Sequence, residues 1–221
     1  LEELLEYPQL ITTQPRPAGK SLAIISKSRC LGLMAADGLL RVGLRPVRFR
    51  GETLDRLKRV LPERWNEDNP IDVGDGGTPE LIEAVTEICM NAPEVNGAMI
   101  VHAPLFPAVS NALVEAIMAV QGRSRVPLLV AWLGGKGMEQ DRETLRKAKI
   151  PTTASLEDAA RAFGAMHGHA RDLELLREIP PRLPVDLRFN RVLAREIIDK
   201  GVSGRGGRLN ELDCKALLAA Y

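Results

Sequence analysis

Short apolar segments alternate with amphipathic ones along most of the chain. Three runs, 21–26 (SLAIIS), 97–103 (GAMIVHA) and 126–133 (VPLLVAWL), show no polar alternation, as is typical of parallel strands covered on both faces. Between such runs, apolar residues recur at helical spacing, as in 31–43 (LGLMAADGLLRVG). The pattern therefore predicts strands that alternate with helices.

Two shorter segments complete the predicted sheet. We expect a strand at 44–49 (LRPVRF), nearer an edge because Pro46 has no N–H for the ladder, and a short strand at 150–154 (IPTTA). Thr78 and Ser155 mark helix starts, since their hydroxyls can accept a hydrogen bond from the first turn. The sequence thus predicts five strands, with the first in a central position.

Strand–helix alternation with short connections indicates an α/β fold, a flavodoxin-like, doubly wound, five-stranded parallel sheet followed by a short helical linker. We expect this domain at 19–176. Residues 1–18 are then the end of a preceding domain and a linker, and 177–221 are a Pro-rich linker with two helices. The chain starts with Leu and stops at Tyr221 within an apolar helical pattern, so we expect it to be a piece of a larger protein.

Charge and cysteine usage argue against several classes of protein. Thirty Lys and Arg against 29 Asp and Glu give a net charge of +1, whereas broad phosphate contact with nucleic acid calls for a clear basic excess. Three widely spaced cysteines form neither a disulfide framework nor a zinc signature. No apolar run reaches the roughly 18 residues that span a bilayer. We expect a soluble, cytoplasmic chain with no nucleic-acid or membrane partner.

The loop after the first strand, 26–32 (SKSRCLG), is the first candidate site. Ligands gather at the carboxyl ends of strands in this fold, and a helix N-terminus favours an anion there. Lys27 and Arg29 add positive charge, and Ser26 and Ser28 add hydroxyl donors, so we predict that these four bind phosphate or a similar ligand. The alternative is a plain strand-to-helix turn with solvated cations, since neither GxGxxG nor a Walker A pattern is present.

The second candidate is the loop 69–80 (NPIDVGDGGTPE). Its glycines permit close approach of a backbone, and Asp72 and Asp75 supply carboxylates. We predict that Asn69, Asp72 and Asp75 contact a ligand. Hard cations such as Ca²⁺ are coordinated by more oxygen ligands than this run contains, so we expect no metal site. The alternative is a tight turn fixed by hydrogen bonds from the Asn and Asp side chains.

Other motifs carry less information. The run 133–139 (LGGKGME) lacks the spacing of a phosphate-binding P-loop. His167 and His169 stand two apart on a predicted helix and therefore do not face each other. His102 ends a strand, but the sequence pairs it with no acid, base or nucleophile. We therefore assign no catalytic residue.

Five segments resemble, in sequence and in order, one enzyme family. They are SLAIISKSRCLGLMAADGLLRVGL, NPIDVGDGGTPELIEAV, GAMIVHAPL, VPLLVAWLGGKGMEQDRETLRKAKIPTTASLEDAARAF and LNELDCKALLAAY. The family is that of the NDP-forming acyl-CoA synthetases, which include ADP-forming acetate–CoA ligases and are relatives of succinyl-CoA synthetase. The match is to the second flavodoxin-like ligase domain, placed at 19–176. The resemblance implies that 1–18 closes the first ligase domain and that 177–221 leads into an ATP-grasp domain.

The resemblance implies an activity of the whole parent protein. An acyl-CoA, phosphate and a nucleoside diphosphate would give the acid, CoA and a nucleoside triphosphate through a phosphohistidine. That histidine belongs to the first ligase domain, so none of the histidines here inherits its role. CoA, ATP or ADP and Mg are implied for the full-length protein, and none bound by this fragment, which we do not expect to be active alone. The implied partners are the first ligase domain, the ATP-grasp domain and further parent chains in a homo-oligomer.

One position departs from the family pattern. Two helix N-termini, one from each ligase domain, are thought to hold the phosphohistidine, and the second would start near Arg29. The family has a Gly-Gly pair in this loop, where this chain has Arg29 and Cys30. Either these side chains crowd the approach of the phosphohistidine, or Arg29 pairs with its phosphate.

Two alternatives remain open. The same architecture occurs in bacterial protein lysine acetyltransferases, where a catalytically silent synthetase-like region is fused to an acetyltransferase domain, and this chain would then be a regulatory domain. The other alternative is a free-standing flavodoxin-like binding module. The remainder of the parent chain would distinguish these alternatives.

Overall fold

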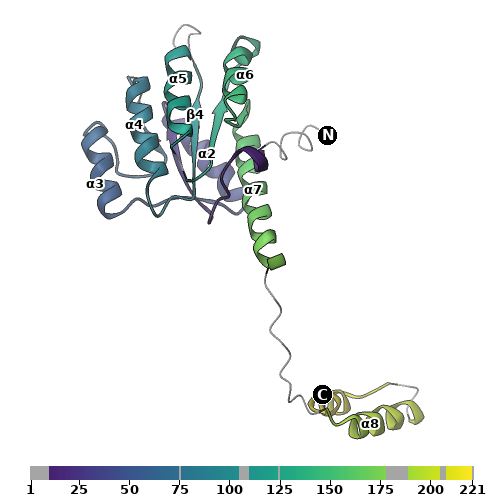
Figure 1. Cartoon of the computed structure of the whole chain (residues 1–221). Coiled ribbons are helices and arrows are strands. Elements are labelled where there is room, and N and C mark those ends of the chain that lie inside the picture. The colour runs from purple at the N-terminus through teal and green to yellow at the C-terminus, as the bar shows by residue number, and fades with distance from the viewer. Residues whose placement is uncertain are drawn as a thin grey trace. The chain divides into compact units, whose positions relative to one another are not determined.

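The computed structural model describes residues 10–74, 76–104, 110–123, 125–177, 189–204 and 208–220. The chain divides into two compact units, Leu1–Arg177 and Glu178–Tyr221. The first unit is a parallel sheet with helices on both faces (Figure 1), and the described residues of the second unit form two helices.

All described strands of the sheet run parallel. They are β1 (Ser21–Ser26), β2 (Arg45–Pro46), β3 (Ile71–Asp72), β4 (Gly97–His102), β5 (Leu128–Trp132) and β6 (Thr152–Thr153). Their order is β2-β1-β4-β5-β6, and β3 pairs with the end of β1 beyond β2. The chain therefore extends the sheet first on one side of β1 and then on the other. In such sheets, ligands bind outside the carboxyl ends of the strands.

The predicted fold class is confirmed, but the sheet has six described strands rather than five. The additional strand, β3, comes from the NPID run that the sequence pattern placed in a loop, where Ile71 and Asp72 pair with the last two residues of β1. The predicted strand at 44–49 is reduced to the two residues of β2. β1 is interior, with partners on both sides, whereas β4 stands in the middle of the row.

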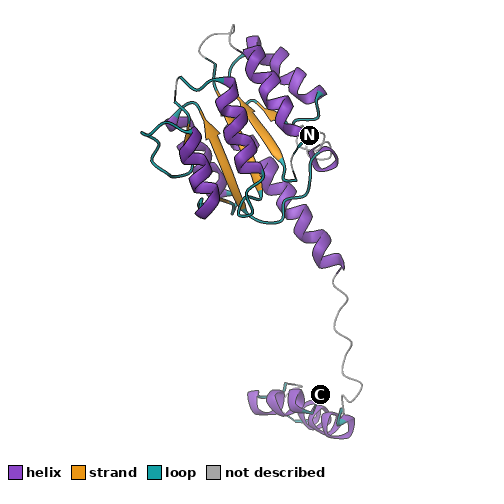
Figure 2. Ribbon diagram, turned by 60° about the vertical axis from the view of Figure 1, so that its left-hand side comes forward, coloured by secondary structure: helices purple, strands orange, loops and turns teal. Residues whose placement is uncertain are grey.

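Helices cover both faces of the sheet (Figure 1, Figure 2). One face carries α3 (Gly51–Val60), α4 (Pro79–Met90), α5 (Ser110–Gln121) and α6 (Glu139–Lys147), and the other carries α2 (Arg29–Arg41) and α7 (Leu156–Arg177). A short 3-10 helix, Lys136–Met138, precedes α6.

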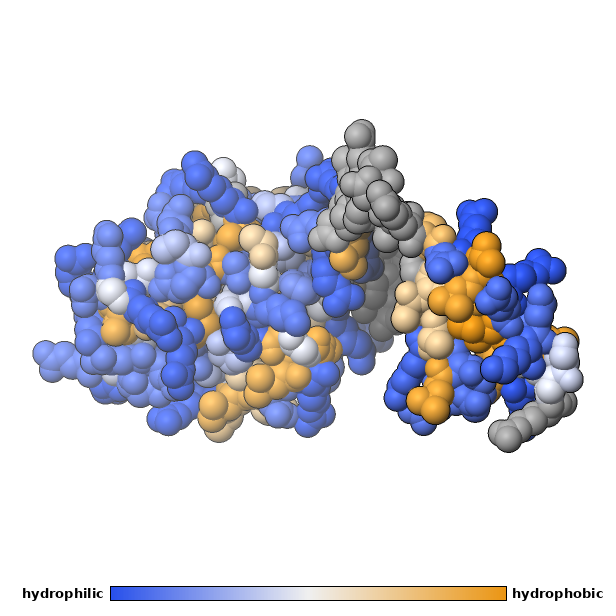
Figure 3. All heavy atoms as spheres, turned by 90° about the horizontal axis from the view of Figure 1, so that it is seen from below, coloured by the Kyte–Doolittle hydropathy of each residue, from blue (hydrophilic) through white to orange (hydrophobic). Residues whose placement is uncertain are grey.

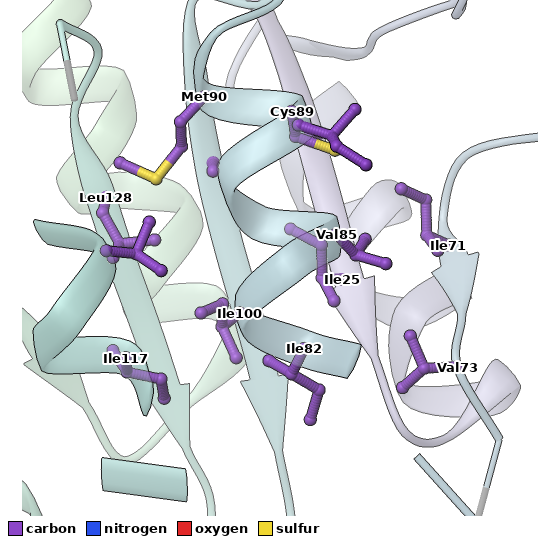
Figure 4. Close-up of a cluster of buried hydrophobic side chains, with 14 of the residues drawn as sticks. Ile25, Ile71, Val73, Ile82, Val85, Cys89, Met90, Ile100, Ile117 and Leu128 are labelled. Atoms are coloured by element: carbon purple, nitrogen blue, oxygen red, sulfur yellow. The ribbon is translucent and has the colours of Figure 1, made fainter. Parts of the chain in front are cut away.

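Each face of the sheet has its own hydrophobic core. On the α4 side, Ile25 of β1 and Ile100 of β4 cluster with Val85 of α4 (Figure 4). On the α2 side, Ile24 and Met99 cluster with apolar residues of α2 and α7. Because both faces are covered, every residue of β1 and β4 is buried, which explains the absence of polar alternation in their sequences.

The helix ends follow the predicted chemistry. Thr78 accepts a hydrogen bond from the Leu81 N–H at the start of α4 (3.2 Å), and Ser155 accepts one from the Asp158 N–H at the start of α7 (3.1 Å). Gly43 follows α2 with φ of 77°, a left-handed conformation that glycine adopts without steric cost.

Part of the segment before β1 packs into the first unit. Gln14 donates a hydrogen bond to the Lys149 carbonyl (2.8 Å) and accepts one from the Leu128 N–H (3.0 Å). Leu10 is buried in the α2-side core. These residues therefore contribute to the sheet domain, and the origin of 1–18 in a preceding domain stays a prediction.

The second unit has little apolar interior of its own. It consists of α8 (Arg191–Ser203) and α9 (Glu211–Ala219), and only Ala194 and Ala220 are buried among its described residues. Figure 3 shows apolar atoms on its surface. Its exposed large apolar side chains include Val192, Leu193, Ile198, Val202, Leu212 and Leu218. Among the described helices of the chain, none is long and apolar enough to cross a membrane.

Candidate anion-binding site

The two loops singled out by the sequence meet at the carboxyl edge of the sheet. A cleft of about 600 Å³ opens between the segments 26–33 and 62–74. Six of the seven predicted site residues line it: Ser26, Lys27, Ser28, Arg29, Asn69 and Asp72. Asp75, the seventh, lies outside the described residues. The structure thus joins two sequence candidates into one site.

The hydroxyl groups of the first loop are used to build the loop itself. Ser26 Oγ accepts a hydrogen bond from the Ser28 N–H (3.1 Å) and donates one to the Ser28 carbonyl (2.8 Å). Ser28 is the N-cap of α2, and its Oγ accepts from the Leu31 N–H at 3.5 Å. Both serines therefore fix the loop, and contact of their hydroxyls with a ligand stays a prediction.

The first turn of α2 has N–H groups to offer a ligand. The third and fourth N–H groups of the helix are bonded to Ser28, which leaves those of Arg29 and Cys30 without an intrahelical partner. Their side chains are exposed and line the open cleft. Gly32 lies directly against Pro70, where a Cβ at Gly32 would stand 2.9 Å from the Pro70 Cβ. This close approach brings the two loops together.

The side-chain amide of Asn69 is committed to the sheet. Its Oδ1 accepts from the Ile24 N–H (2.9 Å), and its Nδ2 donates to the carbonyls of Leu22 (2.7 Å) and Val47 (3.1 Å). β2 pairs with the start of β1 and β3 pairs with its end. Between these two strands, the Asn69 amide makes the hydrogen bonds to β1 that a strand's peptide group would otherwise make. Asn69 thus lines the cleft and is hydrogen-bonded to the sheet, and contact of its amide with a ligand stays a prediction.

Asp72 lines the cleft and also forms a hydrogen bond that fixes a turn. Its Oδ1 accepts from the Gly74 N–H (2.9 Å), as the alternative interpretation of this loop expects. Gly74 has φ of 71°, a conformation that other residues adopt only with strain. The half-buried carboxylate of Asp72 keeps its second oxygen, so a ligand contact there stays a prediction.

Cationic side chains outnumber carboxylates in the cleft. Lys27 and Arg29 line it from the first loop, and Arg64 lines it from the turn after α3, while Asp68 and Asp72 supply the negative charge. None of the three cations forms an ion pair with a described residue. The N-terminus of α2 adds to the positive potential. Arg64 is not among the residues predicted from the sequence, where its closeness to the second candidate loop is the one signal that points to it.

The neighbouring strands β4 and β5 end in buried aromatic rings. His102 ends β4 and Trp132 ends β5, and their buried rings lie with centroids 4.5 Å apart. His102 Nδ1 and Trp132 Nε1 have no hydrogen-bond partner among the described residues. Burial, and secondly the charge of Lys27, lower the pKa of His102 to about 4, against the opposing effect of Asp141. The imidazole is therefore neutral near pH 7.

A buried guanidinium holds the loop after β5. Arg142 donates to the carbonyls of Trp132 (3.1 Å), Gly134 (3.1 Å) and Gly135 (3.4 Å), and it forms an ion pair with Glu139 (2.7 Å). The LGGKGME run is thus held in shape by a side chain of the helix that follows it. None of the three histidines of the chain lines the cleft.

Among known proteins, the chain is similar to ADP-forming acetate–CoA ligases. It is 28% identical to acetate–CoA ligase I of Archaeoglobus fulgidus over 221 residues, which cover 100% of this chain and 30% of the ligase. It is 25% identical to the acetate–CoA ligase of Methanocaldococcus jannaschii over 173 residues, which cover 76% of this chain and 25% of the ligase. The chain thus spans less than a third of the length of these relatives. No family model matches the chain.

Two solved structures share the fold. A crystal structure of a Pyrococcus horikoshii protein has a TM-score of 0.71 and 25% identity, with 78% of this chain and 40% of that chain covered. The acetyl-coenzyme A synthetase 1 of Ca. Korarchaeum cryptofilum, in complex with phosphate and ADP, has a TM-score of 0.68 and 20% identity, with 81% and 40% covered. The relatives and the fold together support a relationship of the chain to the succinyl-CoA synthetase-like family, which includes the ADP-forming acetate–CoA ligases.

Proposed function

We propose that the chain is the second ligase-CoA domain of an NDP-forming acyl-CoA synthetase. In the parent protein, an acyl-CoA, phosphate and a nucleoside diphosphate give the acid, CoA and a nucleoside triphosphate, or the reverse. The domain contributes a binding surface for the phosphoryl group while it is carried by a histidine of another domain. CoA, ATP or ADP and Mg belong to the parent protein.

One observation carries this proposal. The N-terminus of α2 opens into a cleft at the carboxyl edge of the sheet, and Lys27, Arg29 and Arg64 line the same cleft. Backbone N–H groups at a helix start and cationic side chains are the groups that hold phosphate in proteins. Each such helix-end interaction contributes about 0.3–1 kcal/mol when exposed, so the domain alone binds phosphate weakly. A partner domain that covers the cleft would strengthen the interaction, because it excludes water.

The histidines of the chain fit a domain that receives a phosphohistidine rather than forms one. His102 is buried against Trp132 and is neutral near pH 7, while His167 and His169 lie on α7. The acetyltransferase alternative lacks such support, since the relatives named above are ligases.

A phosphate titration followed by amide chemical shifts tests the proposal. At constant ionic strength, we expect phosphate to shift the amide signals of Arg29 and Cys30. The control variant is Arg41→Gln, an exposed cation at the other end of α2, which should respond as wild type does. A response only in the double variant Arg29→Gly, Cys30→Gly would mean that the native side chains block the site. No response in either protein would contradict phosphate binding.

The isolated chain should not catalyse thioester formation. It contains one ligase-type sheet domain, and the proposed reaction needs a phosphohistidine and a nucleotide site from other domains. The measurement is acyl-CoA formation from acid, CoA and ATP by the purified 221-residue chain. Activity above background would show that the domain assignment is wrong.

A further inference from the structure

Arg64 brings positive charge to the second wall of the cleft. It precedes Trp65, which is buried, lies against the Phe49 ring and donates its indole N–H to the Asp68 carbonyl (3.2 Å). These contacts anchor the turn that carries Arg64. A terminal guanidinium nitrogen lies over Gly74, since a Cβ at Gly74 would stand only 3.2 Å from it. The side chain is therefore directed along the wall formed by 62–74.

The two carboxylates that the structure describes in the cleft do not neutralise this guanidinium. Asp68 and Asp72 each accept a backbone N–H, from Asn69 (2.8 Å) and from Gly74 (2.9 Å), and neither is within ion-pair distance of Arg64. Arg64 is exposed. The N–H groups of an exposed arginine on an anchored turn can form a bidentate hydrogen bond with a carboxylate or phosphate.

We propose that Arg64 is a second anion anchor of the cleft, so that the ligand carries two negatively charged groups, one at the N-terminus of α2 and one at Arg64. This inference rests on the proposed function, which supplies the first anchor. About 600 Å³ is far more than one phosphate needs and lies in the range of pockets that hold whole small molecules. Leu33 and Pro62 add apolar surface that suits a hydrocarbon segment joining the two groups.

The test compares two probes in amide-shift titrations. The first is 3-phosphonopropionate, which carries a phosphonate and a carboxylate, and the second is ethylphosphonate, which lacks only the carboxylate. We expect wild type to bind 3-phosphonopropionate about tenfold more tightly, as one charge-assisted hydrogen-bonded pair provides. In Arg64→Gln this advantage should disappear, while the affinity for ethylphosphonate stays unchanged. Arg64→Lys should recover part of it, because lysine keeps the charge but not the planar fork.

The matched control is Arg59→Gln, an exposed arginine in the last turn of α3 that does not line the cleft. It should behave as wild type, and thermal melting of each variant checks that it is folded. Equal affinities of the two probes for wild type, or equal weakening of both by Arg64→Gln, would overturn the second anchor and leave the proposed function standing. No binding of either probe, with no phosphate response at Arg29 and Cys30, would remove both.

Discussion

The carboxyl edge of the sheet has a cleft beside β1 and β3, which we call the open end, and buried polar side chains beside β4 and β5, which we call the closed end. At the open end, Lys27, Arg29 and Arg64 line a cleft and have no ion-pair partner among the described residues. At the closed end, the rings of His102 and Trp132 are buried against each other. The buried side chain of Arg142 donates hydrogen bonds to the carbonyls of Trp132 and Gly134 in the loop after β5. Both ends contain polar side chains, but at the open end the cations line a cleft, whereas at the closed end the imidazole and the guanidinium are buried.

The difference shows how one sheet edge divides its polar groups between stability and binding. A buried polar group stabilises the fold only where it is hydrogen-bonded, and its loss leaves partners unsatisfied. An exposed cation contributes little to stability, so it is available for a ligand. Substitutions at the closed end should therefore change the free energy of unfolding, and substitutions at the open end should change binding.

The largest effect is expected from Arg142→Met. The variant removes the guanidinium that donates to the buried Trp132 carbonyl and to the Gly134 carbonyl, and it leaves Glu139 with Arg146 as its remaining cationic partner. We expect the free energy of unfolding, measured by urea denaturation, to fall by about 4 kcal/mol. Arg41→Met removes an exposed ion pair with Asp37 and should cost less than about 1 kcal/mol. Equal losses in the two variants would contradict the closed-end description.

Asn69→Ala probes the part of the open end that is structural. It removes three hydrogen bonds and leaves the buried Ile24 N–H and Leu22 carbonyl less satisfied, so we expect a loss of about 3 kcal/mol in the free energy of unfolding. Asn66 is exposed and lines the same cleft, and Asn66→Ala should change stability by no more than about 0.5 kcal/mol. A stable Asn69→Ala protein with weakened phosphate binding would mean that the amide serves the ligand instead.

His102 should make stability depend on pH. Its pKa is about 4 in the folded protein, against an ordinary value near 6.5, so the unfolded chain binds more protons between these values. The stabilisation is complete above about pH 6.5 and is lost as the pH falls toward 4. Between about pH 7 and 5, we expect this side chain to cost about 2 kcal/mol of unfolding free energy.

The comparison for this prediction is a variant without the imidazole. The free energy of unfolding is measured by urea denaturation at each pH. In His102→Leu its decrease between about pH 7 and 5 should be smaller by about 2 kcal/mol, whereas His169→Gln should show the same decrease as wild type. An unchanged slope in His102→Leu would show that other groups cause the acid sensitivity.

The smallest effect is expected from Gly74→Ala at the open end. Alanine at φ of 71° is strained, and its Cβ would press on the Arg64 guanidinium. We expect a loss of about 1 kcal/mol in unfolding free energy, with weaker binding of 3-phosphonopropionate. Gly76→Ala is the control, because a Cβ at Gly76 meets no atom within 4 Å and its φ is not positive. Equal effects in both variants would mean that Gly74 has no special role beside Arg64.

Most of the secondary structure could be predicted because it depends on local pattern. The runs of β1 and β4, which lack polar alternation, and the caps Thr78 and Ser155 are all read within a few residues. β3 could not be predicted in this way. Its two residues form a strand only because β1 presents free backbone groups beside them, 45 or more residues away in sequence.

The sequence by itself determined the order of the helices and of the strands other than β3, the two candidate loops and the family resemblance, since these follow from periodicity, turn residues and motifs in order. Only the tertiary structure decided which polar side chains are free. Asn69 and Arg64 lie five residues apart along the chain, yet the amide of Asn69 is bonded to β1, whereas the Arg64 side chain lies in the cleft without an ion-pair partner among the described residues. Hydrogen-bond partners are fixed by distance in space, and that distance depends on contacts such as Gly32 against Pro70, which join segments far apart in sequence.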